Sequence, residues 1–391
     1  METIYLDNNA TTRPAPEVVA AMVSMLTEWY GNPSSVHRFG QRARQALDQA
    51  RAQVAALIGC SDSELIFTGG GTEGVNTAIR GLLSARFPRR RIVTTTVEHS
   101  ATRQLCQQLG AEVPLRLCAD AEIVLVPVDA RGNLDLGAWA AAMQSPQVAL
   151  ATSMWANNET GVIFPIAKMA ALCKEQGVPF HCDGTQAVGK IAVNVKTAGV
   201  DAMSFASHKF HGPKGVGGLF IRRGLRIPPL IIGGPQEKQK RGGTENVPGA
   251  VGMGVAAELA AGHLGDMAKV AGLRDRLEDA ILATIPETAI NGDRANRVPN
   301  TSNIGFAQLE AEAILLLLSE RGICASAGAA CASGSLEPSH VLKAMKVPEA
   351  TAHGAIRFSL SRYTTDAEIE RTLQVLPVVI DKLRKVLPVG V

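Results

Sequence analysis

The sequence AMSFASHKFHGPKGVGGLFI, residues 202–221, contains two short apolar runs that flank a loop rich in glycine and proline. Apolar runs of this length, bounded by turn residues, predict buried β-strands at 202–205 and 218–221. Lys209 follows the first of them and should therefore lie at the carboxyl end of a strand, where open α/β sheets bind their ligands. A partly desolvated amine at that place would be a nucleophile able to form an imine.

The same pattern extends toward the N-terminus, where short strands alternate with helix-length segments such as 72–85 and 166–176. Alternation of this kind predicts an α/β fold with a mostly parallel sheet covered by helices. The clearest runs are apolar throughout, as expected of strands that are buried on both faces. With the two strands above, the sheet should have seven strands, the other five being 64–68, 91–95, 123–128, 148–153 and 179–182.

The pattern changes after about residue 260, where two long helical segments (about 245–284) precede a strand near 301–306, a helix near 310–321 and a final helix from 366. A chain of 391 residues exceeds what one hydrophobic core usually covers. We therefore predict a large domain at 13–260 and a smaller α+β domain formed by 1–12 and 261–391. The run 325–334 consists almost entirely of small residues around Cys331 and should be a mobile loop of the smaller domain.

Charge and cysteine usage exclude several classes of protein. The net charge is +3, without a block of like charges, which indicates neither a nucleic-acid nor a membrane partner. Seven widely spaced cysteines without a C-x-x-C pair argue against a disulfide framework and a zinc site, and they indicate a cytoplasmic protein. No signal peptide is visible at the start, and the longest apolar helical run, 313–318, is too short to span a bilayer.

Two glycine-containing motifs suggest phosphate binding. Residues 69–74 match G-x-G-x-x-G after a strand and at the start of a helix, so a dinucleotide site is one interpretation. Under any interpretation, the helix N-terminus at Gly71 and Thr72 can bind a phosphate. The second motif, 184–190, resembles a P-loop, but Ile191 replaces the magnesium-binding hydroxyl, and we interpret this match as coincidence.

Polar residues follow two further strands. His181, Cys182 and Asp183 could suggest a metal site, but neighbouring residues of a strand point to opposite faces, and no metal is predicted. Asp183 could keep a pyridine nitrogen protonated, or it could simply cap a helix. His99 could stack on a flat cofactor and carry protons, or it could be an ordinary capping residue.

Nine motifs stand out along the chain, at residues 5–12, 31–35, 71–73, 98–99, 156–161, 208–209, 241–246, 331–340 and 356–360. Taken together, they resemble those of the NifS/IscS-like cysteine desulfurases, a branch of the class V aminotransferase family. The resemblance runs in order from residue 4 to about 385, and it includes the cysteine-bearing loop.

The resemblance implies a pyridoxal phosphate (PLP) enzyme of fold type I that acts as a homodimer with shared active sites. It implies that Lys209 carries the cofactor as an imine and that Cys331 takes sulfur from L-cysteine as a persulfide, with alanine released. Catalysis would also use His99, which stacks on the ring. The other implied cofactor contacts are Asp183 to the pyridine nitrogen, Gln186 to the phenolic oxygen, Gly71, Thr72 and His208 to the phosphate with Thr244 of the other subunit, and Asn157; Arg357 and Asn157 would bind the substrate carboxylate.

The sequence departs from the family pattern at two places. Ala206 stands where many members have a phosphate-binding serine, and Ser207 lies one residue later. Beside Cys331 the usual hydroxyl residues are replaced by Ala329 and Ala332. The resemblance also implies a sulfur-acceptor protein, such as an iron–sulfur scaffold, as a partner.

Other functions remain open at this stage. A selenocysteine lyase or another class V aminotransferase would keep the same cofactor site. A non-catalytic sulfur carrier or scaffold would not need the lysine, aspartate, histidine and arginine that the chain retains. An NAD-dependent dehydrogenase would rest on the glycine run alone.

Overall fold

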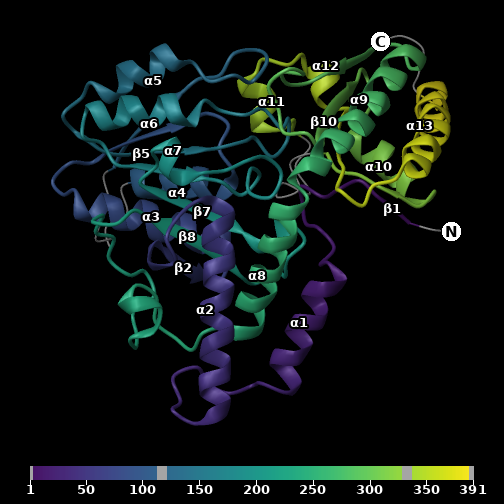
Figure 1. The fold of residues 1–391 in the computed structure, drawn as a ribbon. Coiled ribbons are helices and arrows are strands. Elements are labelled where there is room, and N and C mark those ends of the chain that lie inside the picture. The colour runs from purple at the N-terminus through teal and green to yellow at the C-terminus, as the bar shows by residue number, and fades with distance from the viewer. Residues whose placement is uncertain (1–2, 112–120, 328–336, 387–391) are drawn as a thin grey trace.

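The computed structural model describes residues 3–111, 121–327 and 337–386. Its centre is a seven-stranded sheet in the order β2-β8-β7-β6-β5-β3-β4 (Figure 1). The strands are β2 (Leu65–Thr68), β3 (Arg91–Thr95), β4 (Glu122–Val126), β5 (Val148–Met154), β6 (Phe180–Asp183), β7 (Ala202–Ala206) and β8 (Gly217–Ile221).

The five strands from β7 to β4 are parallel, and β8 runs antiparallel to both of its neighbours, β7 and β2. This confirms the α/β fold with a mostly parallel seven-stranded sheet. The parallel arrangement brings the carboxyl ends of β7, β6, β5 and β3 to the same edge of the sheet, next to one another. Residues that follow these four strands can therefore contribute to one site.

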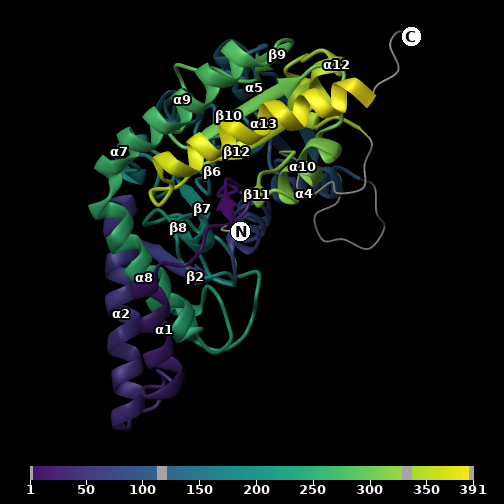
Figure 2. The ribbon, with the colours of Figure 1, turned by 90° about the vertical axis from the view of Figure 1, so that its right-hand side faces the viewer.

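Helices cover the sheet, and three of them form a long extension. Helices α1, α2 and α8 lie alongside one another and project away from the sheet (Figures 1 and 2). At Gly254 of α8, a Cβ atom would come within 2.7 Å of the Ala50 Cα atom of α2, so the glycine permits this close packing. The helices of this part are α1 (Pro16–Thr27), α2 (Arg38–Ile58), α3 (Gly71–Ala85), α4 (Ser100–Gly110), α5 (Leu136–Met143), α6 (Ile166–Glu175), α7 (Val195–Ala198) and α8 (Val247–Gly262).

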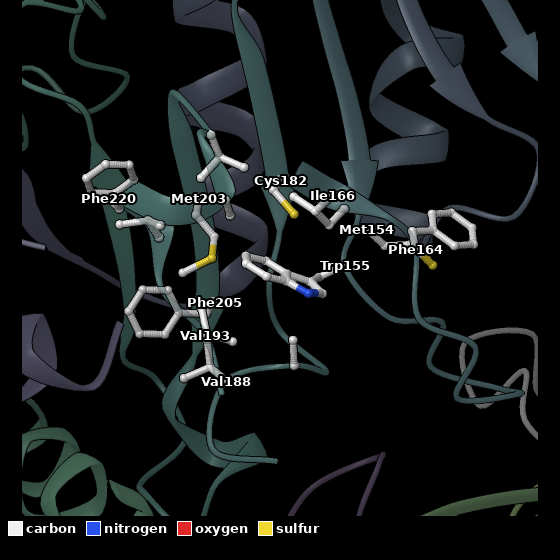
Figure 3. Packing of buried hydrophobic residues seen from close by; sticks show 14 of the residues in the cluster. Met154, Trp155, Phe164, Ile166, Cys182, Val188, Val193, Met203, Phe205 and Phe220 are labelled. Atoms are coloured by element: carbon white, nitrogen blue, oxygen red, sulfur yellow. The ribbon is translucent and has the colours of Figure 1, made fainter. Parts of the chain in front are cut away.

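The core of this part lies on the faces of the sheet. Figure 3 shows a portion of it, in which Trp155, Met203 and Phe205 pack together with residues from the neighbouring strands and turns. Strands β5 to β8 are buried along their whole length, which explains why their sequences are apolar without a two-residue alternation.

A second hydrophobic core lies beside the first. It joins α9 (Met267–Thr284), α10 (Ala311–Ser319) and α13 (Asp366–Val386) to an antiparallel sheet of β9 (Thr288–Ile290), β10 (Thr301–Phe306) and β12 (Ala355–Ser359). A parallel pair, β1 (Ile4–Tyr5) and β11 (Ile323–Cys324), completes it. Ile4 and Leu6 belong to this second core.

The boundary between the two parts is crossed by α11 (His340–Ala344). Its residues Val341 and Leu342 pack on the first core although they lie in the sequence of the predicted smaller domain. The short helix α12 (Glu349–Ala352) follows. The domain limits drawn from the sequence therefore stay a prediction. Most of the predicted mobile loop, 325–334, lies outside the described residues.

Within the described ranges, every helix is either too short or too polar to cross a membrane.

Candidate active site

A cavity of about 330 Å³ lies at the carboxyl ends of β7, β6, β5 and β3. Its volume is within the range of sites that bind small molecules. Eight of the eleven residues predicted for the site line it: Gly71, Thr72, His99, Asp183, Gln186, His208, Lys209 and Arg357.

Lys209 enters the cavity from the turn that follows β7. Its Nζ atom donates hydrogen bonds to the backbone oxygens of Asn9, at 2.6 Å, and Ala10, at 2.8 Å. The amine is half-buried, whereas Lys214, the other lysine of this loop, is exposed and does not line the cavity. Of these two lysines, Lys209 is therefore the one that lies where the predicted nucleophilic amine is needed.

Asp183 is the last residue of β6 and is buried, with 7% of its surface exposed. Its Oδ1 atom accepts a hydrogen bond from the Thr185 backbone at 3.0 Å, so it caps the turn that follows the strand. It also lines the cavity. The capping role and the predicted cofactor role are thus compatible in one carboxylate.

His99 is the N-cap residue of α4, and its Nδ1 atom accepts a hydrogen bond from the Ala101 backbone N–H at 3.2 Å. Burial lowers the pKa of His99 below its ordinary value of 6.5; the Asp183 carboxylate opposes this effect, and the Lys209 charge adds to it. The imidazole is therefore neutral at pH 7. With Nδ1 accepting, its proton is on Nε2.

Glu98 lies directly before His99 and is 1% exposed. Its Oε1 atom accepts hydrogen bonds from the Thr95 hydroxyl at 2.6 Å and from the Met154 backbone at 3.1 Å. No partner for Oε2 is found among the described residues. Burial raises the pKa of Glu98 to about 8, so the carboxyl group is protonated at neutral pH.

The protonated state of Glu98 has a measurable consequence for stability. In the folded chain the carboxyl retains its proton up to about pH 8, whereas in the unfolded chain it loses the proton near the ordinary value of 4.5. Between these values the folded state binds more protons, so the free energy of unfolding decreases as pH rises, by up to about 1.4 kcal/mol per pH unit. Glu98→Gln should remove this contribution.

We therefore expect Glu98→Gln to gain stability relative to the wild type as pH increases from 5 to 8. Urea unfolding at several pH values measures the difference in the free energy of unfolding between the two proteins. The contributions of the other titrating groups cancel in this difference. A difference that is constant over this range would contradict the raised pKa of Glu98.

Arg357, in the centre of β12, brings a positive charge into the cavity from the smaller part of the chain. It is buried, with its guanidinium donating to Asp7 Oδ1 at 2.7 Å and to the Asn158 backbone oxygen at 3.0 Å. A guanidinium held in this way can bind a carboxylate with two parallel hydrogen bonds.

The part of the cavity at the start of α3 is suited to a phosphate group. Helix α3 begins there at Gly71, with Thr72 next to it, and the first N–H groups of a helix lack partners within the helix. His208 lines the same region; burial, with a further contribution from Lys209, lowers its pKa to about 4, so it is neutral.

The structure also resolves the departure at position 206. Ala206 lines the cavity, whereas the Ser207 side chain is fully buried and its hydroxyl lies against Gly212. Ser207 therefore does not replace the missing hydroxyl. Thr185 lines the cavity, and its Oγ1 atom would be 3.2 Å from a Cβ atom at Gly71, so it places a hydroxyl beside the start of α3.

Of the predicted residues that the structure describes, Asn157 and Thr244 do not line this cavity. The amide of Asn157 is buried and holds the turn at 157–160 by accepting from the Glu159 and Thr160 backbones, while its Nδ2 donates to the Val97 backbone oxygen. Thr244 is exposed and absent from the cavity lining, so its predicted role in the partner subunit stays a prediction. Cys331 lies outside the described residues.

Several cavity residues were not assigned a role from the sequence. Asn9 and Ala10 provide the oxygens that bind Lys209, and Glu159 accepts a hydrogen bond from the Ser339 hydroxyl at 2.5 Å. His340 donates from Nε2 to the Glu98 backbone oxygen at 2.9 Å, which links α11 to the turn that carries His99. Asn9, Ala10, Glu159 and His340 line the cavity. The only signal for them in the sequence was their presence within the resembling motifs.

Comparisons with known proteins agree with this arrangement. The model of the class-V aminotransferase family matches residues 4–372. The chain belongs to the class-V aminotransferase family. Cysteine desulfurase 2 of Trichormus variabilis is 51% identical over 99% of this chain and 96% of its own length. The cysteine desulfurase NifS of Azotobacter vinelandii is 48% identical over 99% and 95%. The solved structure of a NifS-like protein, 35% identical, superposes with a TM-score of 0.90 over 97% of this chain and all of the other.

Enzymes of the class-V aminotransferase family use PLP, which confirms the predicted cofactor. The donor groups in the cavity match that molecule. The Lys209 amine can form an imine with the aldehyde of PLP, and the buried Asp183 carboxylate suits its pyridine nitrogen. The N-terminus of α3, with the neutral His208, suits its phosphate. Because Gly71 has no side chain, that helix N-terminus can lie close to Thr185 and Ala206.

Proposed function

We infer that this chain is a PLP-dependent cysteine desulfurase that converts L-cysteine to L-alanine and transfers the sulfur to Cys331 as a persulfide. The observation that carries this function is the identity of about half of all residues, over nearly the entire chain, with named cysteine desulfurases. The cavity supports it, because Lys209, Asp183, His99 and Arg357 converge there.

We propose the following roles for the residues that bind PLP. Lys209 binds PLP covalently, Asp183 faces the pyridine nitrogen, and the N-terminus of α3 with Thr72 and His208 holds the phosphate. When bound, PLP acts as an electron sink for the negative charge that develops at the substrate Cα atom.

Side chains of this chain carry out the proton transfers and the attack on sulfur. Lys209, once released by the substrate amine, accepts the Cα proton. His99, neutral at pH 7, can accept the thiol proton of the substrate or of Cys331 at Nδ1 once that atom releases the Ala101 N–H. The Cys331 thiolate then attacks the substrate sulfur: the new S–S bond forms, the C–S bond breaks, and the electron pair left on Cβ takes up a proton. Return of a proton from Lys209 to the Cα atom completes alanine.

Arg357 provides a test of substrate recognition. We expect Arg357→Leu to raise KM for cysteine about tenfold to a hundredfold, because hydrogen bonds between charged groups contribute roughly 1.5–3 kcal/mol. Arg357→Lys should give a smaller increase, since it keeps the charge but loses the forked geometry. Arg371→Leu, on the exposed surface of α13, is the control. An unchanged KM in Arg357→Leu would remove Arg357 from the substrate site.

We also propose that the enzyme is a homodimer. Helix α1 carries exposed apolar side chains at Val19, Val23 and Leu26, a spacing that places them along one side of the helix. Monomeric proteins rarely leave such surfaces uncovered. Light scattering of the holoenzyme should give the mass of two chains; a monomer at micromolar concentration would contradict this proposal.

The sulfur would pass from Cys331 to an acceptor protein that assembles iron–sulfur clusters or another sulfur-containing cofactor. The five described cysteines are free thiols, which favours a cytoplasmic enzyme. Incubating the holoenzyme with L-cysteine and a reductant should yield alanine and sulfide in equal amounts. Formation of pyruvate or of a transaminated product instead would favour another class V activity. Selenocysteine in a parallel reaction tests the selenocysteine lyase alternative, which the comparisons do not favour.

A further inference from the structure

In the turn after β6, the side chains of Gln186 and Lys190 face each other. Residues 184–190 form successive turns, in which the backbones of Ala187 and Val188 both donate to the Gly184 oxygen. Gln186 and Lys190 are four residues apart and lie on the same side of this segment. The segment is the one whose sequence resembles a P-loop, so its lysine has a place in this fold that is unrelated to nucleotides.

Lys190 is buried and its Nζ atom donates to two oxygens. One is the amide oxygen of Gln186, at short range, and the other is Asn9 Oδ1 at 2.8 Å. The same Asn9 provides the backbone oxygen that accepts from Lys209 Nζ at 2.6 Å and from Gln186 Nε2 at 3.0 Å. A single residue thus connects both lysines and the glutamine.

These contacts fix the orientation of the Gln186 amide. A carbonyl oxygen can only accept, so the Asn9 backbone requires the amide nitrogen of Gln186 on its side. Lys190 donates to the amide oxygen on the other side. Asn9 is oriented in the same way, because its Nδ2 donates to the Asn158 backbone oxygen and its Oδ1 therefore faces Lys190. The second N–H of Gln186 remains available for a group in the cavity, which Gln186 lines.

We propose that Lys190 is a positioning residue that holds the Gln186 amide with its N–H, and not its oxygen, toward the acceptor oxygen of the bound cofactor. This proposal rests on the proposed function, in that Gln186 faces the phenolic oxygen of PLP. If the amide were reversed, two oxygens would face each other and the hydrogen bond would become a repulsion.

The geometry tolerates either protonation state of Lys190. Burial, together with the charges of Lys209 and Arg357, holds the pKa of Lys190 well below its ordinary value. Even as a neutral amine, Lys190 has two N–H bonds, one for each of the two oxygens that it contacts. A nonpolar side chain of similar length would leave both oxygens without this donor.

The test compares cofactor binding in four proteins: the wild type, Lys190→Met, Gln186→Leu and the double variant. PLP is titrated into each apoprotein without cysteine, and the quenching of tryptophan fluorescence and the visible absorption spectrum are recorded. Lys190→Met and Gln186→Leu should each weaken PLP binding about threefold to tenfold, the scale of one hydrogen bond, and change the position of the visible band. The double variant should bind no more weakly than Gln186→Leu alone, because Lys190 acts through Gln186.

Lys196→Met, at an exposed position, is the matched control and should bind as the wild type does. Binding by Lys190→Met that equals the wild type, or losses that multiply in the double variant, would overturn the proposal.

Gln186→Glu keeps an oxygen for Lys190 but has no N–H for the cavity, and it decides the matter if Lys190→Met fails to fold. It should bind PLP more weakly and with a shifted band, and unchanged binding would equally overturn the proposal. Since no cysteine is present, a failure of sulfur transfer cannot produce either result.

Discussion

Lys209→Ala should abolish the visible absorbance of the bound cofactor and lower alanine formation from cysteine by about a thousandfold or more, within the range that covalent and general-base groups contribute. Lys209 has two proposed tasks, holding PLP and accepting the Cα proton, and no other lysine of the described chain lines the cavity. The absorption spectrum of the purified protein and an alanine assay measure the two effects separately.

Lys214→Ala is the control for this experiment, because Lys214 belongs to the same loop but is exposed. It should keep both the spectrum and the rate. If Lys209→Ala retained the wild-type spectrum while Lys214→Ala lost it, the assignment of the amine would be wrong. Folding of both variants can be compared by thermal unfolding of the apoproteins.

Cys331→Ala should reduce persulfide and sulfide formation to background while the spectrum of the bound cofactor stays unchanged. The substrate would still bind at Arg357 and Lys209 would still accept the Cα proton, but no thiolate would attack the sulfur. Hydrogen exchange at the Cα atom of cysteine, followed in deuterated water, should therefore continue in this variant. This separates the sulfur step from the proton step.

Cys324→Ala is the matched control, since Cys324 is half-buried and lies seven residues earlier. It should release sulfide at nearly the wild-type rate. Full activity of Cys331→Ala, or loss of activity in Cys324→Ala with a normal spectrum, would assign the sulfur chemistry to a different thiol.

The sheet could be predicted because its strands are uniformly apolar and end at glycine-rich or polar turns. Strands such as β9 and β12 gave no such signal. β9 has only three residues, and β12 carries Arg357 in its centre. A buried arginine in a strand is stable only with a partner, and that partner is Asp7, which is 350 residues away in the sequence. Local patterns contain no information on such a pairing.

The site was predictable to the extent that its residues follow parallel strands and match family motifs. What the sequence does not contain is the set of hydrogen bonds that determines where each polar group points. Asn9 shows this best, because its main-chain oxygen binds Lys209 and its side chain binds Lys190. Every residue type has a backbone oxygen, so a contact made by that atom does not show in the sequence. For the same reason the amide of Asn157, placed in the site by resemblance, is found holding its own turn.

The most direct test of the account is to follow the sulfur atom. The holoenzyme is incubated with a single equivalent of L-cysteine carrying a heavy sulfur isotope, without a reductant, and is then alkylated, digested and analysed by mass spectrometry. We predict one heavy sulfur atom on the peptide that contains Cys331, together with one equivalent of alanine. Alanine formation with no labelled sulfur on that peptide, or with the label on Cys324 instead, would contradict the proposed transfer to Cys331.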